Sequence, residues 1–441
     1  MVISKEDAPV KVLAHKAKAA AAAMASTPDN MRISALANIA CQIRKNKQEI
    51  LQANQKDVAA AKDLVKNGAI SQSMADRLHM DEFKLEAVCT GIEQIAALGD
   101  PVGKVDLARE LDHDLQLFRI TCPIGVVGVI FEARPDALPQ IAALCLRSAN
   151  AVILKGGAEA ENSNRALFAC IKKAATESGL PGDALVLLSS RSEVAELLQA
   201  HQYVDLIIPR GSSALVKHIQ ENTDIPVLGH AEGICHIYVD EAADLDKANR
   251  IICDAKAQYP AACNSVETVL VHKNVAAAFL PILAGSLSKL HVKIRCDSKT
   301  AKHLNPNFTF ELMSPEQWST EYGDLVLAIK TVDDLDEAIA HINEHGSNHT
   351  EAMITENLPS FDKFFAQVNS AGIFLNASTR FADGFRYGFG AEVGISTGKM
   401  HPRGPVGIEG LVTYKYKLVG KGQIVADYVG KDAKAFLHKN I

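Results

Sequence analysis

The chain has 441 residues, of which 48% are hydrophobic and 22% charged, and its formal net charge is −6. This length exceeds what one hydrophobic core usually supports, so more than one domain is expected, and the apolar content excludes a wholly disordered chain. The charge is mild and dispersed, and no apolar run is long enough to span a bilayer, which argues against nucleic acid and membrane as partners.

The amino-terminal part, from Val10 to about Leu64, is rich in Ala, Leu, Lys and Gln. Its apolar residues recur at helical spacing, and Pro28 interrupts them. Two or three helices are therefore predicted here.

Strand and helix signals alternate in the next part of the chain. Short β-branched or alternating runs predict strands, and amphipathic stretches that end at turn residues predict helices. The predicted strands are Leu115–Thr121, Gly125–Phe131, Ala151–Leu154, Leu185–Leu188 and Val204–Ile208, and the predicted helices are Ala137–Ser148, Asn164–Ser178, Glu193–Gln199 and Ala214–Glu221. Such a series of βα units implies a parallel sheet that is covered on both faces.

A second series of the same kind begins near Ile234. Its predicted strands are Ile234–Val239, Thr268–Val271 and Leu325–Ile329, with a helix at Leu245–Ala257. A second α/β domain is therefore expected. Further on, Leu411–Val419 alternates in character and is predicted to be an exposed strand, suited to pairing with the edge of another subunit.

Nine cysteines are scattered along the chain without a Cys-x-x-Cys pair, which is typical of a reducing compartment and predicts a cytoplasmic protein. Cys263 is distinctive because it precedes a polar trio and then an apolar strand. A thiolate at such a turn is a nucleophile, and neighbouring backbone N–H groups and the Asn264 amide could bind an oxyanion. A buried structural cysteine is the alternative, and spacing alone does not decide between the two.

Two turns have features of nucleotide-binding loops. Gly211 and Ser212 connect a predicted strand to a helix, whose amino terminus presents free N–H groups to an anion. Lys155 ends a strand before a pair of glycines, and so faces the edge at which α/β sheets bind ligands. A Ser-capped helix and a solvated lysine beside a flexible loop are the alternatives.

Two arginines are candidates for anion recognition. Arg134 precedes a proline, which restricts the backbone conformation of Arg134 and so fixes the direction of its side chain. Arg380 lies near Asp383 in a second loop. Guanidinium groups bind carboxylate or phosphate in a forked geometry, and a substrate with two anionic ends would need two of them. A surface ion pair is the alternative for each arginine.

Three histidines, His341, His345 and His349, are spaced as if they lay on one helical face. Gly346 is expected to end that helix after His345, and the sequence lacks the carboxylate pattern of a helical zinc site. No metal site is therefore predicted.

Taken in order, these stretches resemble the gamma-glutamyl phosphate reductases of the aldehyde dehydrogenase superfamily over nearly the whole chain. The most specific are IFEARPD, LIIPRGSS, GICHIYVDEAADLDKA, YPAACNSVET, NASTRFADGF and GAEVGISTGKMHPRGPVGIEGLVTYKY. The resemblance implies an α/β fold with two doubly wound parallel-sheet domains and a small β oligomerisation flap. It implies a cofactor domain over 1–228, with 112–121 in the flap, a catalytic domain over 229–401, and a return to the cofactor domain and flap over 402–441.

The resemblance also implies a reaction and the residues that perform it. NADPH would reduce L-glutamyl 5-phosphate to L-glutamate 5-semialdehyde in proline biosynthesis. Phosphate would leave as Cys263 forms a thioester, while Asn264 holds the oxyanion. By the same resemblance, the cofactor contacts are Lys155, Gly211, Ser212 and Glu321, and the substrate contacts are Arg134, Arg380 and Asp383.

Two positions depart from the superfamily pattern. Oxidising members carry a Glu that activates water to hydrolyse the thioester, and the aligned residue here is His230, with Glu232 nearby. The missing base suits a reductase, because activated water would consume the acyl intermediate. Where many relatives have Lys after the Lys-Gly-Gly turn, this chain has Ala158 and then Glu159, whose carboxylate would repel a ribose 2′-phosphate. NADPH is expected, with NADH as the lesser alternative.

The sequence is also compatible with two other functions. One is reduction or oxidation of a different acyl phosphate or aldehyde, and the other is a cofactor-binding subunit without catalysis. The resemblance implies a homo-oligomer, a dimer or tetramer, that acts on a small molecule. An association with glutamate 5-kinase, which makes the labile substrate, is a further expectation.

Overall fold

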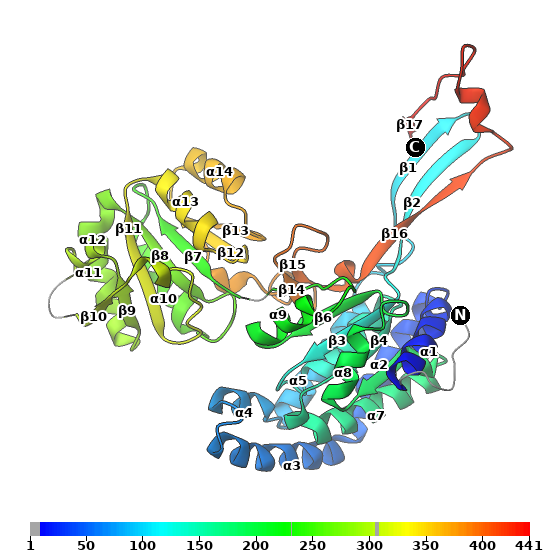
Figure 1. Cartoon of the computed structure of the whole chain (residues 1–441), viewed down its shortest axis with the longest axis horizontal. Coiled ribbons are helices and arrows are strands. Elements are labelled where there is room, and N and C mark those ends of the chain that lie inside the picture. Colours follow the sequence, from blue (N-terminus) through cyan, green and yellow to red (C-terminus); the bar gives the residue numbers. More distant parts are fainter. Residues whose placement is uncertain (1–8, 231, 305–307) are drawn as a thin grey trace. The chain divides into compact units, whose positions relative to one another are not determined.

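The computed structural model describes residues 9–230, 232–304 and 308–441 (Figure 1). The chain forms two compact units. Unit 1 contains Met1–Leu228, Phe389–Gly394 and Val406–Ile441, and unit 2 contains Gly229–Gly388 and Ile395–Pro405. Each unit has its own parallel sheet and its own buried apolar cluster.

Five helices form the amino-terminal part of unit 1. They are α1 (Pro9–Met24), α2 (Asp29–Lys45), α3 (Lys47–Lys66), α4 (Gln72–Leu78) and α5 (Glu82–Ala97). The helices predicted between Val10 and Leu64 are confirmed, and the break at Pro28 directly precedes α2. Ser71 and Asp81 accept hydrogen bonds from backbone N–H groups of the first turns of α4 and α5 and so begin these helices. Among the described residues, no helix has both the length and the apolar character needed to cross a bilayer.

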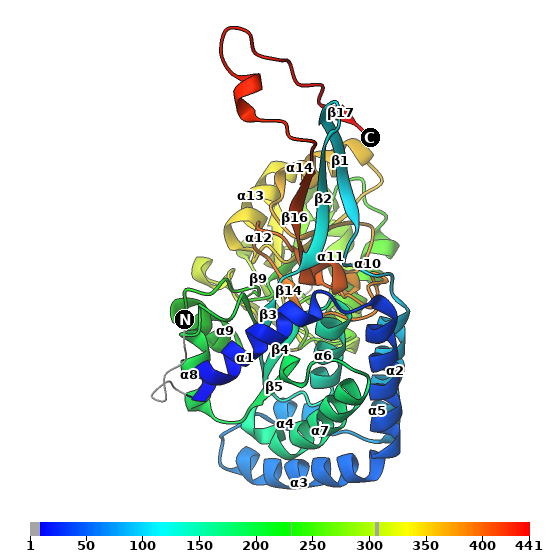
Figure 2. The ribbon, with the colours of Figure 1, turned by 90° about the vertical axis from the view of Figure 1, so that its right-hand side faces the viewer.

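A four-stranded parallel sheet, with the strand order β5-β4-β3-β6, forms the centre of unit 1 (Figures 1 and 2). Its strands are β3 (Val126–Phe131), β4 (Ala151–Lys155), β5 (Leu185–Leu188) and β6 (Leu206–Arg210), and its helices are α6 (Ala137–Arg147), α7 (Glu161–Glu177), α8 (Arg191–Leu198) and α9 (Ser213–Glu221). The predicted βα series is confirmed. Every residue of β3 and β4 is buried, as expected for strands of a parallel sheet covered on both faces.

A second sheet of unit 1 is antiparallel and has the order β16-β2-β1-β17. Its strands are β1 (Val105–Asp112), β2 (Leu115–Pro123), β16 (Val412–Val419) and β17 (Lys439–Asn440). The predicted exposed strand is confirmed as β16, in which every residue after Val412 is exposed. The flap range predicted from the sequence, 112–121, includes most of β2 but only the last residue of β1. Strand β1 was not predicted, although Val105, Leu107 and Leu111 alternate with Asp106, Glu110 and Asp112 along it.

Unit 2 contains a seven-stranded parallel sheet with the order β10-β9-β11-β8-β7-β12-β13. Its strands are β7 (Cys235–Val239), β8 (Val266–His272), β9 (Lys293–Cys296), β10 (Phe310–Leu312), β11 (Val326–Val332), β12 (Thr350–Ile354) and β13 (Gly372–Leu375). Its helices are α10 (Leu245–Ala257), α11 (Lys273–Lys289), α12 (Ser298–Ala301), α13 (Leu335–His345) and α14 (Leu358–Gln367). A two-stranded sheet joins β14 (Gly394–Ser396) to β15 (Gly404–Val406). The predicted fold class, with two parallel-sheet α/β domains, is confirmed.

His341 is a buried titratable group of α13. Its side chain is 4% exposed and packs against the rings of His236, Trp318 and His345. Its Nδ1 lies 3.3 Å from the Nζ of Lys330. Burial, with a smaller contribution from the nearby positive charges, lowers the pKa of His341 to about 2. The folded protein therefore keeps this imidazole neutral at physiological pH.

Acidification is expected to destabilise unit 2 through His341. The unfolded side chain has a pKa near 6.5, so below that pH unfolding takes up a proton that the folded side chain does not bind. The free energy of unfolding is thus highest, as far as His341 is concerned, above about pH 6.5. It falls as the pH drops below that value, by about 2 kcal/mol at about pH 5. The fluorescence of Trp318, the only Trp, can follow urea unfolding. Between about pH 7 and about pH 5, the free energy of unfolding of His341→Gln should fall by about 2 kcal/mol less than that of the parent. An equal fall in both proteins would contradict the role given to His341.

Candidate active site

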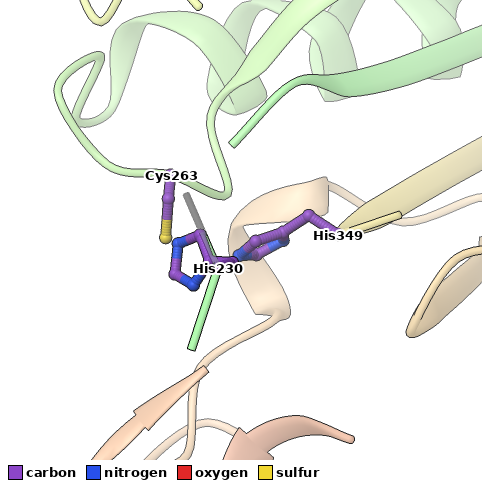
Figure 3. A group of neighbouring side chains, drawn as sticks. All are labelled: His230, Cys263 and His349. Atoms are coloured by element: carbon purple, nitrogen blue, oxygen red, sulfur yellow. The ribbon is translucent and has the colours of Figure 1, made fainter. Parts of the chain in front are cut away.

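Three loops of unit 2 meet at one edge of its sheet. Strands β8, β7 and β12 are neighbours and run parallel, so the residues that precede them lie at the same edge. Cys263 precedes β8, His230 precedes β7, and His349 directly precedes β12. Figure 3 shows these three side chains as neighbours. The candidate active site is built at this edge.

Cys263 is a half-buried free thiol in the turn between α10 and β8. Its backbone lies against Gly233, where an added Cβ would be 2.3 Å from the Cys263 carbonyl oxygen and 2.5 Å from its Cα. The Sγ of Cys235 donates a hydrogen bond to the same carbonyl, at 3.3 Å. Complete burial raises the pKa of the Cys235 thiol well above its usual range, so this neighbour stays protonated. Cys263 is therefore the accessible thiol of the pair.

Asn264 joins the Cys263 turn to the loop that carries Arg380. The side chain of Asn264 is 4% exposed, and its Nδ2 donates to the carbonyl oxygen of Ala382 at 2.8 Å. The hydroxyl of Thr379 donates in turn to the Asn264 carbonyl oxygen, at 2.7 Å. An amide NH₂ group has two hydrogens, and this contact uses one of them. The structure thus places Cys263, Asn264 and the Arg380 loop together.

Arg380 is 8% exposed, and its guanidinium group is fixed by its neighbours. Its Nε donates to Oε1 of Gln258 at 2.9 Å, and its Cζ lies 5.8 Å from the ring centroid of Tyr259. Burial lowers the pKa of Arg380, and the charge of Arg386 adds to this effect. Asp383 accepts hydrogen bonds from two backbone N–H groups of the following turn, at 3.0 and 3.1 Å. Arg380 is therefore held by Gln258 and Tyr259, and Asp383 accepts backbone N–H groups within its own loop.

Glu321 lies in the loop before β11, beside a buried ion pair. The Nζ of Lys256 is 2.8 Å from Oε2 of Glu267, and the two side chains are 0% and 1% exposed. Burial raises the pKa of Glu267 to about 7, and the charge of Glu321 acts in the same direction. Burial also lowers the pKa of Lys256. Glu267 accepts a hydrogen bond from the Gly323 N–H at 3.3 Å, which ties the Glu321 loop to β8.

The other predicted contacts lie in unit 1, at the carboxyl edge of its sheet. Strands β3 and β6 are neighbours although β4 and β5 separate them in the chain, and α/β sheets bind ligands at such a reversal of strand order. Gly211 and Ser212 follow β6, Arg134 follows β3, and Lys155 ends β4. The Ser212 N–H donates to Oε2 of Glu132 at 2.8 Å, and the Ser212 hydroxyl caps α9. This edge therefore already holds a carboxylate at a helix amino terminus.

Lys155 is 7% exposed and lies among charged groups. Burial lowers its pKa, which the carboxylates of Glu159, Glu132 and Glu193 partly counteract, while Arg191 adds to the lowering. Oε1 of Glu159 accepts a hydrogen bond from a backbone N–H of the loop after β3, at 2.6 Å. Three carboxylates and two cations therefore set the charge balance at this edge.

His349 stands out in the sequence only as one of three evenly spaced histidines, and nothing there indicates that it lies beside Cys263. Helix α13 ends at His345, as predicted, and Gly346 follows it, so His349 leaves the helical face of the other two histidines. Its ring centroid lies 5.0 Å from that of His230, whereas Glu232 is exposed. His230 is thus the residue beside Cys263. The strand order that brings β12 next to β7 would have identified His349, but that order is not a local feature of the sequence.

Replacing Gly233 by Ala is expected to disturb the Cys263 turn. The added methyl group would overlap backbone atoms, which cannot swing aside, so a loss of about 1–3 kcal/mol in unfolding free energy is expected. Alkylation of Cys263, followed by mass spectrometry of its peptide, should also slow. Gly285→Ala is the matched control, because a Cβ there has its nearest neighbour at 3.9 Å. Unchanged stability and alkylation in Gly233→Ala would contradict this account.

The comparisons with known proteins identify the family of the chain. Residues 2–302 match the family model described as the aldehyde dehydrogenase family. The chain is 52% identical over 433 residues to the gamma-glutamyl phosphate reductase of Nostoc punctiforme, which covers 98% of each chain. It is 49% identical over 442 residues to that of Methanosarcina acetivorans, with 99% of this chain and 98% of the relative covered.

A solved structure is similar as well. The crystal structure of gamma-glutamyl phosphate reductase from Thermotoga maritima matches with a TM-score of 0.90 at 36% identity, covering 95% of this chain and 100% of that one. The resemblance drawn from the motifs is thereby confirmed. The chain belongs to the aldehyde dehydrogenase family and, within it, to the gamma-glutamyl phosphate reductases.

Proposed function

We propose that the chain catalyses the NADPH-dependent reduction of L-glutamyl 5-phosphate to L-glutamate 5-semialdehyde, with release of phosphate, as a step of proline biosynthesis. The observation that carries the proposal is Cys263, a half-buried free thiol whose backbone is held against Gly233 and whose neighbours are Asn264 and His230. Family membership and full-length identity to named reductases support this substrate. Unit 2 is the proposed catalytic domain, and unit 1 is the proposed cofactor domain.

The proposed chemistry begins at the sulfur of Cys263. Its thiolate attacks the carbonyl carbon of the acyl phosphate, a C–S bond forms, and the C–O bond to phosphate breaks, so that phosphate leaves with the electron pair. The second amide hydrogen of Asn264 and the Cys263 N–H stabilise the charge that develops on the carbonyl oxygen. The resulting thioester accepts a hydride at the same carbon. Expulsion of the Cys263 thiolate then gives the aldehyde.

The side chain next to the nucleophile supports release of an aldehyde rather than an acid. Oxidising aldehyde dehydrogenases use a Glu carboxylate to activate water, and His230 occupies the aligned position in this chain. Glu232, the other candidate for that role, is exposed. A thioester without an adjacent carboxylate base persists long enough to be reduced.

The substrate carries anionic groups, and Arg380 is the strongest proposed contact for one of them. Its guanidinium group is buried and already oriented by Gln258, so little conformational freedom is lost on binding. Arg134 is the second proposed anion contact. Asp383 is proposed to act by holding the Arg380 loop in shape, because its carboxylate accepts backbone N–H groups.

The carboxyl edge of the unit 1 sheet fits a nicotinamide dinucleotide, the cofactor class of the family. The Ser212 N–H holds the carboxylate of Glu132, which shows that this helix terminus accepts an anion. Gly211 allows the close approach of the Glu132 carboxylate, because an added Cβ would lie 2.4 Å from its Oε2. These donors would hold the pyrophosphate, Lys155 the adenosine ribose with its phosphate, and Glu321 the nicotinamide ribose. When bound, NADPH supplies the hydride.

The antiparallel sheet of unit 1 is proposed to join subunits into a dimer or tetramer. Strand β16 lies at the edge of that sheet, and its Tyr414, Tyr416 and Leu418 are 50%, 58% and 57% exposed. Apolar side chains on an exposed edge favour pairing with another chain. The association with glutamate 5-kinase stays a prediction from the resemblance. The nine free cysteines favour the reducing cytoplasm as the proposed location.

Turnover in the oxidative direction should require both phosphate and Cys263. With glutamate 5-semialdehyde and NADP⁺, the parent protein is expected to form NADPH only when phosphate is present to accept the acyl group. Cys263→Ala should lower this rate by about 1000-fold or more. Cys253→Ala, a half-buried thiol on α10, is the control that should retain the rate. Turnover without phosphate would mean that water takes the acyl group and would refute the reductase mechanism.

Glu159 is expected to weaken the preference for NADPH. Glu159→Gln removes a negative charge near Lys155 but keeps an oxygen that can accept the hydrogen bond from the loop after β3. The ratio of kcat/KM for NADPH to that for NADH should rise by about 5-fold, which corresponds to about 1 kcal/mol of relieved repulsion. Glu161→Gln, at an exposed position of α7, is the control. An unchanged ratio in Glu159→Gln would show that this carboxylate does not face the 2′-phosphate.

A further inference from the structure

The side chains around the proposed nucleophile have the composition of a zinc site. The Sγ of Cys263 and one ring nitrogen each of His230 and His349 all lie within 4.8 Å of one another (Figure 3). We propose that these three residues bind Zn²⁺ reversibly and that the bound ion blocks Cys263. The binding rests on this geometry alone. The inhibition rests in addition on the proposed function, in which Cys263 is the nucleophile.

His349 gives the first independent support. Its side chain is 1% exposed, and its Nδ1 lies 2.9 Å from Oγ1 of Thr350 and 3.7 Å from Sγ of Cys235. Its Nε2 is buried and has no hydrogen-bond partner. A buried polar atom without a partner costs about 1–3 kcal/mol. The ring reaches toward His230 in Figure 3, so a metal ion in the cluster would satisfy this nitrogen.

His230 gives the second support, through its other ring nitrogen. Its Nδ1 lies 2.9 Å from the carbonyl oxygen of Ile395. A carbonyl oxygen only accepts hydrogen bonds, so Nδ1 carries a hydrogen in this contact, and a metal ion would be bound through Nε2. Metal-binding histidines typically donate their second N–H to a carbonyl or carboxylate in this way, which fixes the ring and the tautomer. The surroundings of His230 thus match those of a metal ligand.

The donor set selects a thiophilic ion. A thiolate and two neutral imidazoles suit Zn²⁺, which takes four ligands in a tetrahedron and would keep a water molecule in the fourth position. Mg²⁺ and Ca²⁺ require oxygen ligands and are excluded by this set. Ligand atoms on a tetrahedral zinc ion lie about 3.3–3.8 Å apart, so the widest separation must shorten by about 1 Å. Side-chain rotation of Cys263 and His230, both half-buried, can provide this change.

The proposed ion is an inhibitor and not a cofactor. On binding, the thiol of Cys263 loses its proton to solvent as the S–Zn bond forms, and no group is oxidised or reduced. A sulfur bonded to Zn²⁺ does not attack an acyl carbon, so the ion and the substrate compete for the same atom. A chelator that removes the ion restores the thiol and the activity.

Co²⁺, which takes the place of Zn²⁺ in such sites, provides a test that does not depend on activity. Titration of the full-length protein with Co²⁺ should produce a thiolate-to-cobalt charge-transfer band and the visible absorption of a four-coordinate ion, and added Zn²⁺ should remove both. Cys263→Ser should abolish the charge-transfer band. His349→Gln and His230→Gln should weaken Zn²⁺ binding by about 100-fold or more, because each removes a ligand. His345→Gln, on α13, is the matched control and should bind as the parent does.

Each result separates the site from the function. Absence of the thiolate band in the parent protein, or its persistence in Cys263→Ser, would overturn the proposed site. Zn²⁺ binding that requires all three residues but leaves the reductase rate unchanged would retain the site and overturn both the inhibition and the nucleophilic role of Cys263. Thermal unfolding shows whether each variant is folded. If His349→Gln is not, the variants at the half-buried His230 and Cys263 decide the outcome.

Discussion

The parallel pairing of β8, β7 and β12 is the constraint on which the active site depends. Every residue of these strands is buried, so their order and register are fixed by the core of unit 2. Each strand delivers the residue before it to a common edge, which is how Cys263, His230 and His349 become neighbours. A shift of one residue in any strand would displace its loop by about 3.3 Å, which exceeds the length of a hydrogen bond.

The Ser212 turn lies at the carboxyl edge of the unit 1 sheet, whereas Cys263 lies at the amino edge of the unit 2 sheet. The local electrostatics of the two edges differ accordingly. At the carboxyl edge of unit 1, helices begin, and their N–H groups favour anions, as the contact of Ser212 with Glu132 shows. At the amino edge of unit 2, helices end, and α10 stops shortly before Cys263. In the described part of unit 2, the helix that precedes β8 thus directs its carboxyl terminus, and not its amino terminus, at that edge. Side chains must therefore provide its positive charge, and the buried Arg380 is the proposed source, while the Asn264 amide is proposed to act beside the Cys263 N–H as a hydrogen-bond donor.

Much of the fold could be predicted from local patterns, and the site only in part. The strands and helices of the central βα units carry apolar periodicity, and the structure contains them close to the predicted bounds. Strand β1 was not predicted although its apolar residues alternate with acidic ones, interrupted only by Arg109. Strands β9 and β10 were missed because they are short and lie toward the edge of the sheet, and β12 and β13 were not predicted either. Cys263 and Asn264 stand in a distinctive motif. His349 and the contact of Gly233 with Cys263 depend on which strands are neighbours, and periodicity does not encode that information.

The carboxylate of Glu132 on the Ser212 N–H acts as an internal occupant of its own anion site. A cofactor phosphate bound at this proposed site would exchange with the Glu132 carboxylate, so its binding free energy would be a difference between two charge-assisted hydrogen bonds and not the full value of one. The affinity is lower as a result, but the Ser212 N–H keeps a hydrogen-bond acceptor when no ligand is bound. The turn therefore stays ordered between successive ligands. In the proposed cofactor site, this exchange would favour release of the dinucleotide after each catalytic cycle over tight retention.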